Sequence, residues 1–211
     1  MLNISRNWDI KIIGITDRKY LGENIEKGVE LALKGGIKAI QYREKEMDDR
    51  YKYKKALVLR ELCDNYGAIL IVNDRPDIAI LSHSHGVHLG QSDLPVDKVR
   101  GIFQGLIGVS VGNKKEAEEA EVKGADYLGL GAFYHSNTKQ DIAEVEDKVV
   151  KEIKKSVKIP VIAIGGINIS NVRAVMKKGV DGIALSEGLF TGDIFVNASR
   201  LVDLVNKYVS H

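Results

Sequence analysis

Cysteine, proline and excess charge of either sign are all scarce in this 211-residue sequence. The single cysteine, Cys63, allows no disulfide within the chain and no cysteine-rich zinc site, so we expect a reducing compartment and a cytoplasmic protein. Only three prolines occur, and no Pro/Ser-rich segment or shift in composition marks a linker, so we expect one domain over residues 1–211. Lys and Arg number 31 against 29 Asp and Glu, a balance that argues against a dedicated nucleic-acid binder.

Long hydrophobic runs and two common catalytic motifs are missing as well. Charged residues interrupt the first 18 residues before any apolar run reaches the length of a signal peptide or a membrane span, so we expect no membrane partner. The sequence has no Gly-x-Ser-x-Gly segment and no P-loop lysine, which leaves hydrolase and nucleoside-triphosphatase functions without support. It has instead 44% apolar and 28% charged residues, the balance of a globular protein.

Short apolar segments recur along the whole chain. There are eight of them, each rich in Ile, Val or Leu, and most are too short for a helix. Their near-continuous apolar character predicts strands that are covered on both faces, as in a parallel sheet, rather than strands with one face in water. The predicted strands are 11–16, 37–42, 68–73, 86–90, 106–110, 125–131, 160–166 and 181–186.

Helical patterns separate these apolar segments. The predicted helices are 24–33, 48–66, 114–122 and 170–178. We expect Ser170 to be the N-cap of the last one. Lys-Gly pairs at 34–35, 123–124 and 178–179 each come before a predicted strand, which indicates a repeated unit of helix, glycine stop and strand. Proline stands only at predicted element starts, at Pro76, Pro95 and Pro160.

Eight such units in about 200 residues fit a (β/α)8 barrel, although a doubly wound open sheet could use the same elements. Polar or glycine residues at the ends of nearly all predicted strands favour the barrel. A barrel gathers ligand-binding residues from the carboxyl ends of all its strands, whereas an open sheet uses one crevice. We therefore predict an α/β protein with a single (β/α)8 TIM barrel. The strand-end residues are Thr16, Asp17, Gln41, Asn73, Asp74, Gln91, Ser110, Gly131, Gly165, Gly166 and Ser186.

Gln41, Arg43 and Lys45 alternate at the end of the second predicted strand and so share one side of an extended chain. An amide beside two cationic side chains suits a polyanion such as a diphosphate, because Arg offers a fork of donors and Lys a mobile charge. A solvated charge cluster at the start of a helix explains the segment 41–45 equally well.

Carboxylates follow two neighbouring predicted strands. Asn73 and Asp74 follow the third strand, and Asp93 follows the fourth. Two carboxylates without a cysteine or a histidine pair predict hard oxygen ligands for Mg²⁺, which completes its shell with water and substrate phosphates. Helix capping is the alternative for Asp74 and for Asp93 taken singly, since each precedes a proline-containing helix start.

Two glycine-containing segments at later strand ends suit phosphate. Gly165-Gly166 follows the seventh predicted strand, and Ser186 to Gly188 follows the eighth. The loops after these two strands often bind phosphate through backbone N–H groups in barrels, although a glycine pair also makes an ordinary turn. The segment 131–139 offers two hydroxyls and a lysine, which predicts an anion-binding lid, with a plain surface loop as the alternative.

Three histidines have the close spacing of a metal cluster. His83 and His85, however, precede the fourth predicted strand, which contains His88. They therefore fall on the rim of the barrel opposite the expected site. For these histidines we expect local hydrogen bonding or surface exposure rather than zinc binding. Cys63 lies within a predicted helix and is expected to be a small core residue.

The motifs, taken together and in order, resemble the thiamin phosphate synthase family. Each piece is weak alone, but the set in this order along eight βα units is specific. The matching segments are Thr16-Asp17-Arg18, QYREK (41–45), NDR (73–75), HLGQSD (88–93), GVS (108–110), GADYLGLG (124–131), NTK (137–139), AIGGI (163–167) and GIALS (182–186).

The resemblance implies a transferase that joins hydroxymethyl-aminopyrimidine diphosphate to a thiazole phosphate, giving thiamin phosphate and pyrophosphate with Mg²⁺ as cofactor. These two small molecules are the implied partners, with no nucleic acid and no membrane, and the oligomeric state stays open, a homo-oligomer included. Arg43, Ser110 and Lys139 are the implied catalytic residues, and Asp74 and Asp93 the implied metal ligands. The implied substrate-binding residues are Gln41, Arg43, Lys45, Asn73 and Lys139 for the diphosphate, Ser110 beside the departing diphosphate, Ser136 and Thr138 for phosphate groups in the lid, and Gly166 with the Ser186 backbone for the thiazole phosphate.

The segment 131–139 departs from the family's pattern. The family has proline at the places of Ala132 and His135 and threonine at the place of Ser136. Since proline reduces the entropy lost when a loop orders, we expect a less stiff segment whose ordering over a diphosphate costs more.

Two other functions stay open at this stage. The related thiazole tautomerase shares the barrel and relies on a histidine at the place of Gly112, whereas this sequence keeps the diphosphate and magnesium residues, so the synthase is favoured. A non-catalytic sensor of a phosphate ligand on the same barrel is the second alternative, and turnover would separate it from an enzyme.

Overall fold

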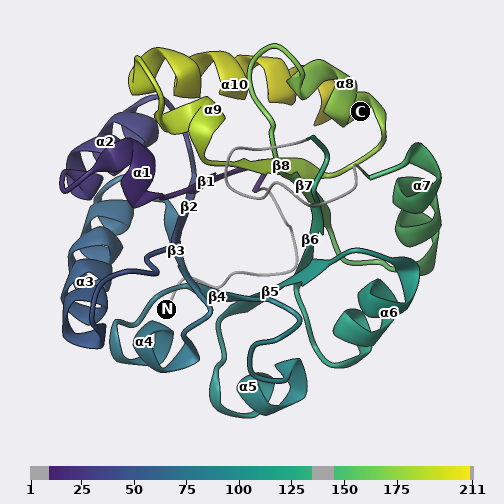
Figure 1. The fold of residues 1–211 in the computed structure, drawn as a ribbon, viewed down its shortest axis with the longest axis horizontal. Helices are drawn as coiled ribbons and strands as arrows, with labels where there is room; N and C mark the ends of the chain where they lie inside the picture. Colours follow the sequence, from purple (N-terminus) through teal and green to yellow (C-terminus); the bar gives the residue numbers. More distant parts are fainter. Residues whose placement is uncertain (1–9, 135–144, 210–211) are drawn as a thin grey trace.

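A computed structural model describes residues 10–134 and 145–209, and in it the chain forms a closed barrel of eight parallel strands. Each strand pairs with the next one along the chain, and β8 closes the ring against β1 (Figure 1). The closed ring confirms the predicted (β/α)8 barrel and excludes the open sheet. The strands are β1 (Ile12–Ile15), β2 (Ala39–Tyr42), β3 (Ile69–Asn73), β4 (Gly86–Leu89), β5 (Leu106–Val111), β6 (Tyr127–Gly131), β7 (Val161–Ile164) and β8 (Gly182–Leu185).

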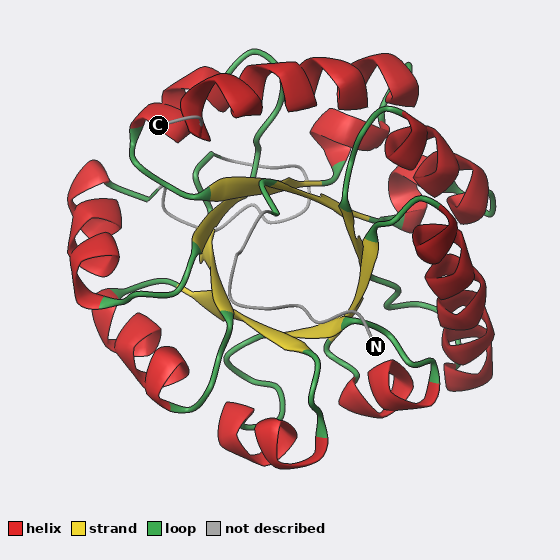
Figure 2. Ribbon diagram, turned by 180° about the vertical axis from the view of Figure 1, so that it is seen from behind, coloured by secondary structure: helices red, strands yellow, loops and turns green. Residues whose placement is uncertain are grey.

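Helices surround the barrel on the outside (Figure 2). The patterns over 24–33, 48–66 and 114–122 are confirmed as α2, α3 and α6. Across the described ranges, no helix is both long and apolar enough to cross a membrane. The helices are α1 (Arg18–Leu21), α2 (Ile25–Lys34), α3 (Asp49–Asn65), α4 (Pro76–Leu81), α5 (Val96–Ile102), α6 (Lys114–Val122), α7 (Asp147–Ser156), α8 (Val172–Lys177), α9 (Glu187–Phe190) and α10 (Ile194–Val209).

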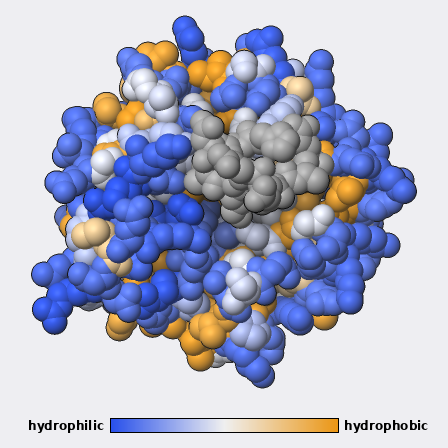
Figure 3. Space-filling model, viewed as in Figure 1, coloured by the Kyte–Doolittle hydropathy of each residue, from blue (hydrophilic) through white to orange (hydrophobic). Residues whose placement is uncertain are grey.

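Hydrophilic side chains cover most of the face seen in Figure 3, and apolar ones lie scattered among them. This distribution is expected when each helix turns its apolar side toward the barrel and its polar side toward water.

The helix predicted over 170–178 is present as α8, but its predicted N-cap is wrong. The Ser170 hydroxyl donates to Asn168 Oδ1 at 2.6 Å and is therefore committed to the turn before the helix. Asn171 takes the N-cap position, and its Oδ1 accepts from the Asn168 N–H at 2.8 Å instead of from the first helical turn. The prolines do stand at element starts, with Pro76 opening α4, Pro95 capping α5 and Pro160 preceding β7.

Side chains alternate along the strands between the barrel interior and the layer beneath the helices. On β1, Ile13 and Ile15 belong to the interior cluster, whereas Ile12 packs in the outer layer. Cys63 is buried in that outer layer, as expected. The interior cluster consists of Ile13, Ile15, Ala39, Ile71, Tyr127, Ile162 and Ala184.

The amino-terminal rim of the barrel repeats one hydrogen bond at three places. In each case the residue directly before an even-numbered strand accepts a backbone N–H from near the start of the preceding strand. The three bonds are Leu70 N–H to His85 Nδ1 at 3.0 Å, Ile107 N–H to Asp126 Oδ2 at 2.7 Å, and Val161 N–H to Asp181 Oδ2 at 2.7 Å.

A basic side chain from a helix also lies at each of these three places. Arg100 of α5 bonds to Asp126, and Lys154 of α7 bonds to Asp181 at 2.5 Å. Arg60 of α3 donates to the carbonyl of His83, close to the His85 ring. Each place therefore joins two neighbouring strands to a covering helix, and His85 confirms the expectation of local hydrogen bonding.

Candidate active site

A cavity of about 1010 Å³ lies at the carboxyl ends of the strands. Ile15, Ile164 and Ala184, which belong to or pack against the interior cluster, form part of its lining, so the apolar barrel core closes it from below. Many polar side chains also line it. The lining includes every predicted site residue that falls within the described ranges, namely Gln41, Arg43, Lys45, Asn73, Asp74, Asp93, Ser110, Gly166 and Ser186. The other three predicted site residues, Ser136, Thr138 and Lys139, lie outside the described residues, as does His135.

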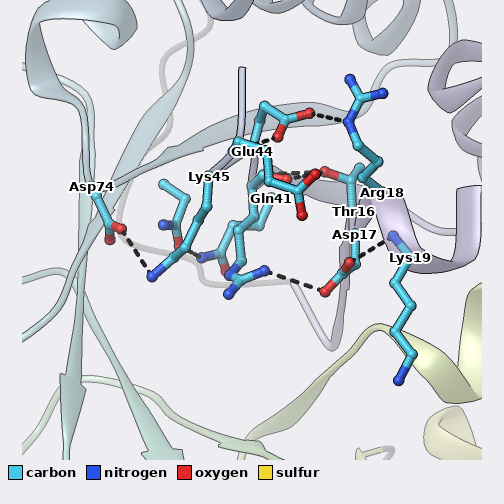
Figure 4. A network of polar contacts seen from close by, with 11 residues as sticks. Thr16, Asp17, Arg18, Lys19, Gln41, Glu44, Lys45 and Asp74 are labelled. Atoms are coloured by element: carbon cyan, nitrogen blue, oxygen red, sulfur yellow. Dashed lines mark hydrogen bonds and ion pairs between the residues drawn. The ribbon is translucent and has the colours of Figure 1, made fainter. Parts of the chain in front are cut away.

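Gln41, Arg43 and Lys45 all line this cavity, as the alternation of an extended chain predicts. Figure 4 shows Gln41 and Lys45 on one side of the segment and Glu44 directed toward Arg18. The buried Gln41 amide donates to Asn73 Oδ1 at 2.7 Å. Because α3 begins only at Asp49, the alternative of a charge cluster at a helix start is wrong.

The turn after β1 holds Arg43 in place by three hydrogen bonds. The Arg43 N–H donates to Thr16 Oγ1 at 2.9 Å, and the Thr16 hydroxyl in turn lies 3.3 Å from the Arg43 carbonyl. The guanidinium donates to Asp17 Oδ2 at 3.2 Å, and Asp17 Oδ1 also accepts from the Lys19 N–H at the start of α1 (Figure 4). Thr16 and Asp17, the first residues of the family resemblance, therefore orient Arg43.

Asp74 and Asp93 both line the cavity, and their carboxyl groups lie against one another. Burial, reinforced by the hydrogen bond and negative charge of Asp93, raises the pKa of Asp74 above its usual range. Lys45 Nζ lies 3.9 Å from Asp74 Oδ2 and acts in the opposite direction. Asp93 also accepts from the Gly90 N–H at 2.6 Å, which closes the turn after β4.

Neither carboxylate caps a helix, so the capping alternative is wrong for both. The N-cap of α4 is Arg75 and that of α5 is Pro95, and neither makes a side-chain capping bond. Asp74 has a φ of 62°, in the left-handed region that Asp tolerates better than most residues.

The carboxylate pair fits a hard divalent cation. Two carboxylates held together at a partly buried position repel one another, and a cation relieves that repulsion. Within residues 10–134 and 145–209 no three His, Cys, Asp or Glu side chains gather as a metal site, so the protein offers Asp74 and Asp93 alone there. Mg²⁺ suits such a pair because it keeps several waters and takes further oxygens from a substrate phosphate.

His88 lies inside the barrel beside Ser110 and lines the cavity, whereas the sequence predicts only local hydrogen bonding or surface exposure for it. Its Nε2 lies 2.9 Å from Ser110 Oγ, and its Nδ1 lies 3.0 Å from the Tyr127 hydroxyl. Burial lowers the pKa of His88 to about 4, so the ring is neutral. The signal was available in the alternation of β4, since Val87 and Leu89 are apolar and the residue between them must point inward.

The loops after β7 and β8 lie against one another and form another part of the cavity wall. Gly165 and Gly166 have φ values of 103° and 62°, which side-chain-bearing residues rarely adopt. A Cβ on Gly188 would lie 2.4 Å from the Ile167 carbonyl oxygen, so the two loops pack at backbone distance. The buried Ser186 hydroxyl has no hydrogen-bond partner among the described residues.

Comparison with known proteins agrees with the resemblance. Residues 12–189 match the family model described as thiamine monophosphate synthase. The thiamine-phosphate synthase of Clostridium acetobutylicum is 44% identical over 206 residues, 96% of this chain and 98% of that one. The enzyme of the same name from Fusobacterium nucleatum is 44% identical over 87% of this chain and 90% of its own length. The structure of thiamine phosphate pyrophosphorylase from Pyrococcus furiosus superposes with a TM-score of 0.89 at 39% identity, covering 95% of this chain and 98% of that one. The chain therefore belongs to the thiamine monophosphate synthase family.

Proposed function

We propose that this protein is a thiamin phosphate synthase that joins hydroxymethyl-aminopyrimidine diphosphate to a thiazole phosphate and releases pyrophosphate. One observation carries the proposal beyond family membership. A row of one amide and two cations, Gln41, Arg43 and Lys45, meets the carboxylate pair Asp74 and Asp93 in a single cavity. Such an arrangement suits a diphosphate together with its divalent cation.

The reaction asks the protein for charge stabilisation rather than for a nucleophile. The bond between the pyrimidine methylene carbon and the diphosphate oxygen breaks, and its electron pair leaves with the pyrophosphate. The thiazole nitrogen then supplies the electron pair of the new carbon–nitrogen bond. An electron-rich pyrimidine spreads the positive charge on the methylene carbon, so the barrier depends mainly on how well the leaving group is stabilised and water excluded.

The roles of the residues follow from their places in the cavity. Arg43, fixed by Thr16 and Asp17, and Lys45 would bind the diphosphate oxygens. Gln41, bonded to Asn73, would hold the same substrate from β2 and β3. Ser110 would donate to the departing pyrophosphate. Lys139 would add a further positive charge there, a role inferred from the family motif because it lies outside the described residues.

Asp74 and Asp93 would hold Mg²⁺, which supplies neutralising charge to the diphosphate when it is bound. Gly166 and the Ser186 backbone would take the thiazole phosphate through N–H groups, in the loops that bind phosphate in many barrels. Ser136 and Thr138 would contact phosphate groups in the lid. The tautomerase alternative is disfavoured because Gly112 lines the cavity and brings no side chain to it.

The test is to incubate the purified protein with both substrates and Mg²⁺ and to separate the products by liquid chromatography. The proposal expects thiamin phosphate, and none when either substrate is omitted. Binding of the pyrimidine diphosphate without product would indicate a sensor instead. Isomerisation of a thiazole carboxylate phosphate in the absence of the pyrimidine would indicate a tautomerase.

A further inference from the structure

A hydrogen-bonded row of three side chains leads from Tyr127 in the barrel interior through His88 to Ser110 in the cavity wall. We propose that His88 is a positioning residue that donates from Nε2 to Ser110 and so leaves the Ser110 hydroxyl hydrogen free to bond to the departing pyrophosphate. Tyr127 selects the required form of His88 by donating to Nδ1. The inference rests on the proposed synthase function. It adds to that function a positioning role for His88, which acts on the diphosphate through Ser110.

Strand register brings His88 and Tyr127 together over a glycine. His88 of β4 pairs with Gly108 of β5, and Gly108 pairs with Tyr127 of β6. A Cβ on Gly108 would lie 2.1 Å from the Tyr127 ring, so any side chain there would displace it. The two rings can therefore meet across the middle strand, with their centroids 5.5 Å apart.

A second glycine makes room on the Ser110 side. Ser110 pairs in the sheet with Gly129 of β6, and a Cβ on Gly129 would lie 3.0 Å from His88 Cε1. The His88 ring thus fills space that a side chain at 129 would take, and its Nε2 reaches Ser110. The surroundings hold the ring in one orientation, which is what a positioning role requires.

Two hydrogen-bond arrangements are consistent with the distances, because a neutral imidazole has one donor and one acceptor nitrogen. In the first, Nδ1–H donates to Tyr127 and the Ser110 hydroxyl donates to Nε2, so Ser110 offers the cavity only lone pairs. In the second, Tyr127 donates to Nδ1 and Nε2–H donates to Ser110, which leaves the serine hydrogen for the cavity.

The hydrogen-bond character of the diphosphate expected in the cavity favours the second arrangement. A diphosphate is an acceptor of hydrogen bonds and carries no donor toward Ser110 when it is ionised, so lone pairs directed at it would be repulsive. Negative charge grows on the diphosphate as the carbon–oxygen bond breaks, so a donor from Ser110 strengthens in the transition state. The arrangement with hydrogen on His88 Nε2 is the one that serves the reaction.

The kinetic test uses variants that separate donation from packing. His88→Gln places an amide N–H where Nε2–H lies, whereas His88→Leu removes the donor. We expect His88→Leu and Ser110→Ala each to lower kcat by about a hundredfold, the lower end of the range for a lost donor to developing negative charge. The double variant should be no slower than either single one, and His88→Gln should recover most of the rate.

A structural role for His88 predicts a different result. Losses in the double variant that multiply, or a His88→Gln protein as slow as His88→Leu, would overturn the proposal. Urea unfolding of each variant reports whether the fold is retained, and the His88→Gln comparison remains informative if His88→Leu does not fold.

A spectroscopic test needs no turnover. In protein labelled with ¹⁵N-histidine, with Mg²⁺ and inorganic pyrophosphate added, the His88 signals should show hydrogen on Nε2, assigned by their loss in His88→Gln. Tyr127→Phe should move part of the population to the Nδ1–H form. Hydrogen on Nδ1 in the unmodified protein would refute the arrangement. Absence of thiamin phosphate synthesis would refute the proposed function instead, and the NMR result would still decide the hydrogen-bond direction.

Discussion

The two rims of the barrel hold similar charged side chains with different partners. At the amino-terminal rim, Asp126 and Asp181 each accept a buried strand N–H and a basic side chain from a helix. At the carboxyl-terminal rim, Asp74 and Asp93 face each other; Lys45 Nζ lies 3.9 Å from Asp74 Oδ2, and the positive charge of Arg43 also acts on Asp74. The carboxylates of the amino-terminal rim bond to backbone and basic groups of the protein, whereas those of the carboxyl-terminal rim lie against each other.

This contrast separates stability from function. A carboxylate whose hydrogen bonds are all made within the protein contributes to folding, whereas two facing carboxylates destabilise the fold unless a ligand joins them. Barrels commonly place activity at the carboxyl ends of the strands and stability at the other rim. Substitutions at the carboxyl-terminal rim should therefore lower the rate of synthesis, whereas matched substitutions at the amino-terminal rim should lower the free energy of unfolding.

The largest effect is expected from Asp93→Asn. The amide oxygen can still accept from the Gly90 N–H, but one of the two metal-binding charges is lost. We expect synthesis to fall by at least about a hundredfold, the scale of a removed charge-stabilising group, while the melting temperature stays the same or rises. Asp97→Asn, at an exposed position in the first turn of α5, is the control and should retain activity. Near-normal synthesis by Asp93→Asn in the presence of a chelator would show that the magnesium assignment is wrong.

Asp126→Ala should produce the opposite result. It leaves the buried Ile107 N–H without its acceptor and Arg100 without its carboxylate. An unsatisfied buried group costs roughly 1–3 kcal/mol, so the free energy of unfolding in urea should fall by about that amount. The rate per folded molecule should be unchanged. Asp126→Asn keeps an oxygen for the N–H and should lose less stability. If Asp126→Ala slowed catalysis in fully folded protein, the separation between the rims would not hold.

Asp17→Asn addresses the orientation of Arg43. The amide can still accept from the Lys19 N–H, but its hold on the guanidinium weakens. We expect kcat/KM for the pyrimidine diphosphate to fall by about tenfold, less than the roughly hundredfold cost of a 1 Å misplacement in an active site. Glu44→Gln disturbs the matching pair with Arg18 outside the cavity and serves as control. Equal effects of the two variants on kcat/KM would contradict a specific role for Asp17.

A further prediction concerns His85, which occupies at the amino-terminal rim the place that Asp126 and Asp181 take elsewhere, and whose effect is absent near neutral pH. Burial, with a contribution from nearby Arg60, lowers the pKa of His85 to about 4, and its neutral Nδ1 accepts from the Leu70 N–H. The unfolded chain takes up this proton near pH 6.5 while the folded chain does not, so protonation favours unfolding. Stability should be full above pH 6.5 and fall toward pH 4, by up to about 1.4 kcal/mol per pH unit from this residue.

His85→Asn tests that pH dependence, because the amide oxygen can accept the same N–H and does not titrate. The free energy of unfolding should vary less steeply between pH 6.5 and 4 than in the unmodified protein. His88 titrates in the same window and is present in both proteins, so its contribution cancels from the difference. Identical slopes would show that His85 is not held neutral.

The strands and the barrel could be predicted because burial on both faces leaves a direct signal in the sequence. β3, for example, has four consecutive apolar residues before Asn73. The placement of Gln41, Arg43 and Lys45 in one cavity agrees with the alternation of the segment, although β2 itself ends at Tyr42. For these elements, local pattern and final position agree.

Other parts of the site depended on information that no local pattern contains. From the sequence, Asp74 could either cap a helix or line a cavity. Its φ of 62° differs from the extended backbone of a helix N-cap, and its side chain lines the cavity. The contact between His88 and Tyr127 joins residues 39 positions apart through the register over Gly108. The hold of Asp17 on Arg43 likewise depends on β1 lying beside β2. The roles of Ser136, Thr138 and Lys139 remain predictions.

A single-turnover experiment tests the central claim most directly, with the protein in excess over both substrates and Mg²⁺ present. Phosphorus NMR of the quenched reaction would measure thiamin phosphate and pyrophosphate together. The account predicts equal amounts of both products from the unmodified protein and from Asp126→Asn, and almost none from Asp93→Asn. Bound substrates recovered unchanged from the unmodified protein, or products formed as well by Asp93→Asn, would contradict it.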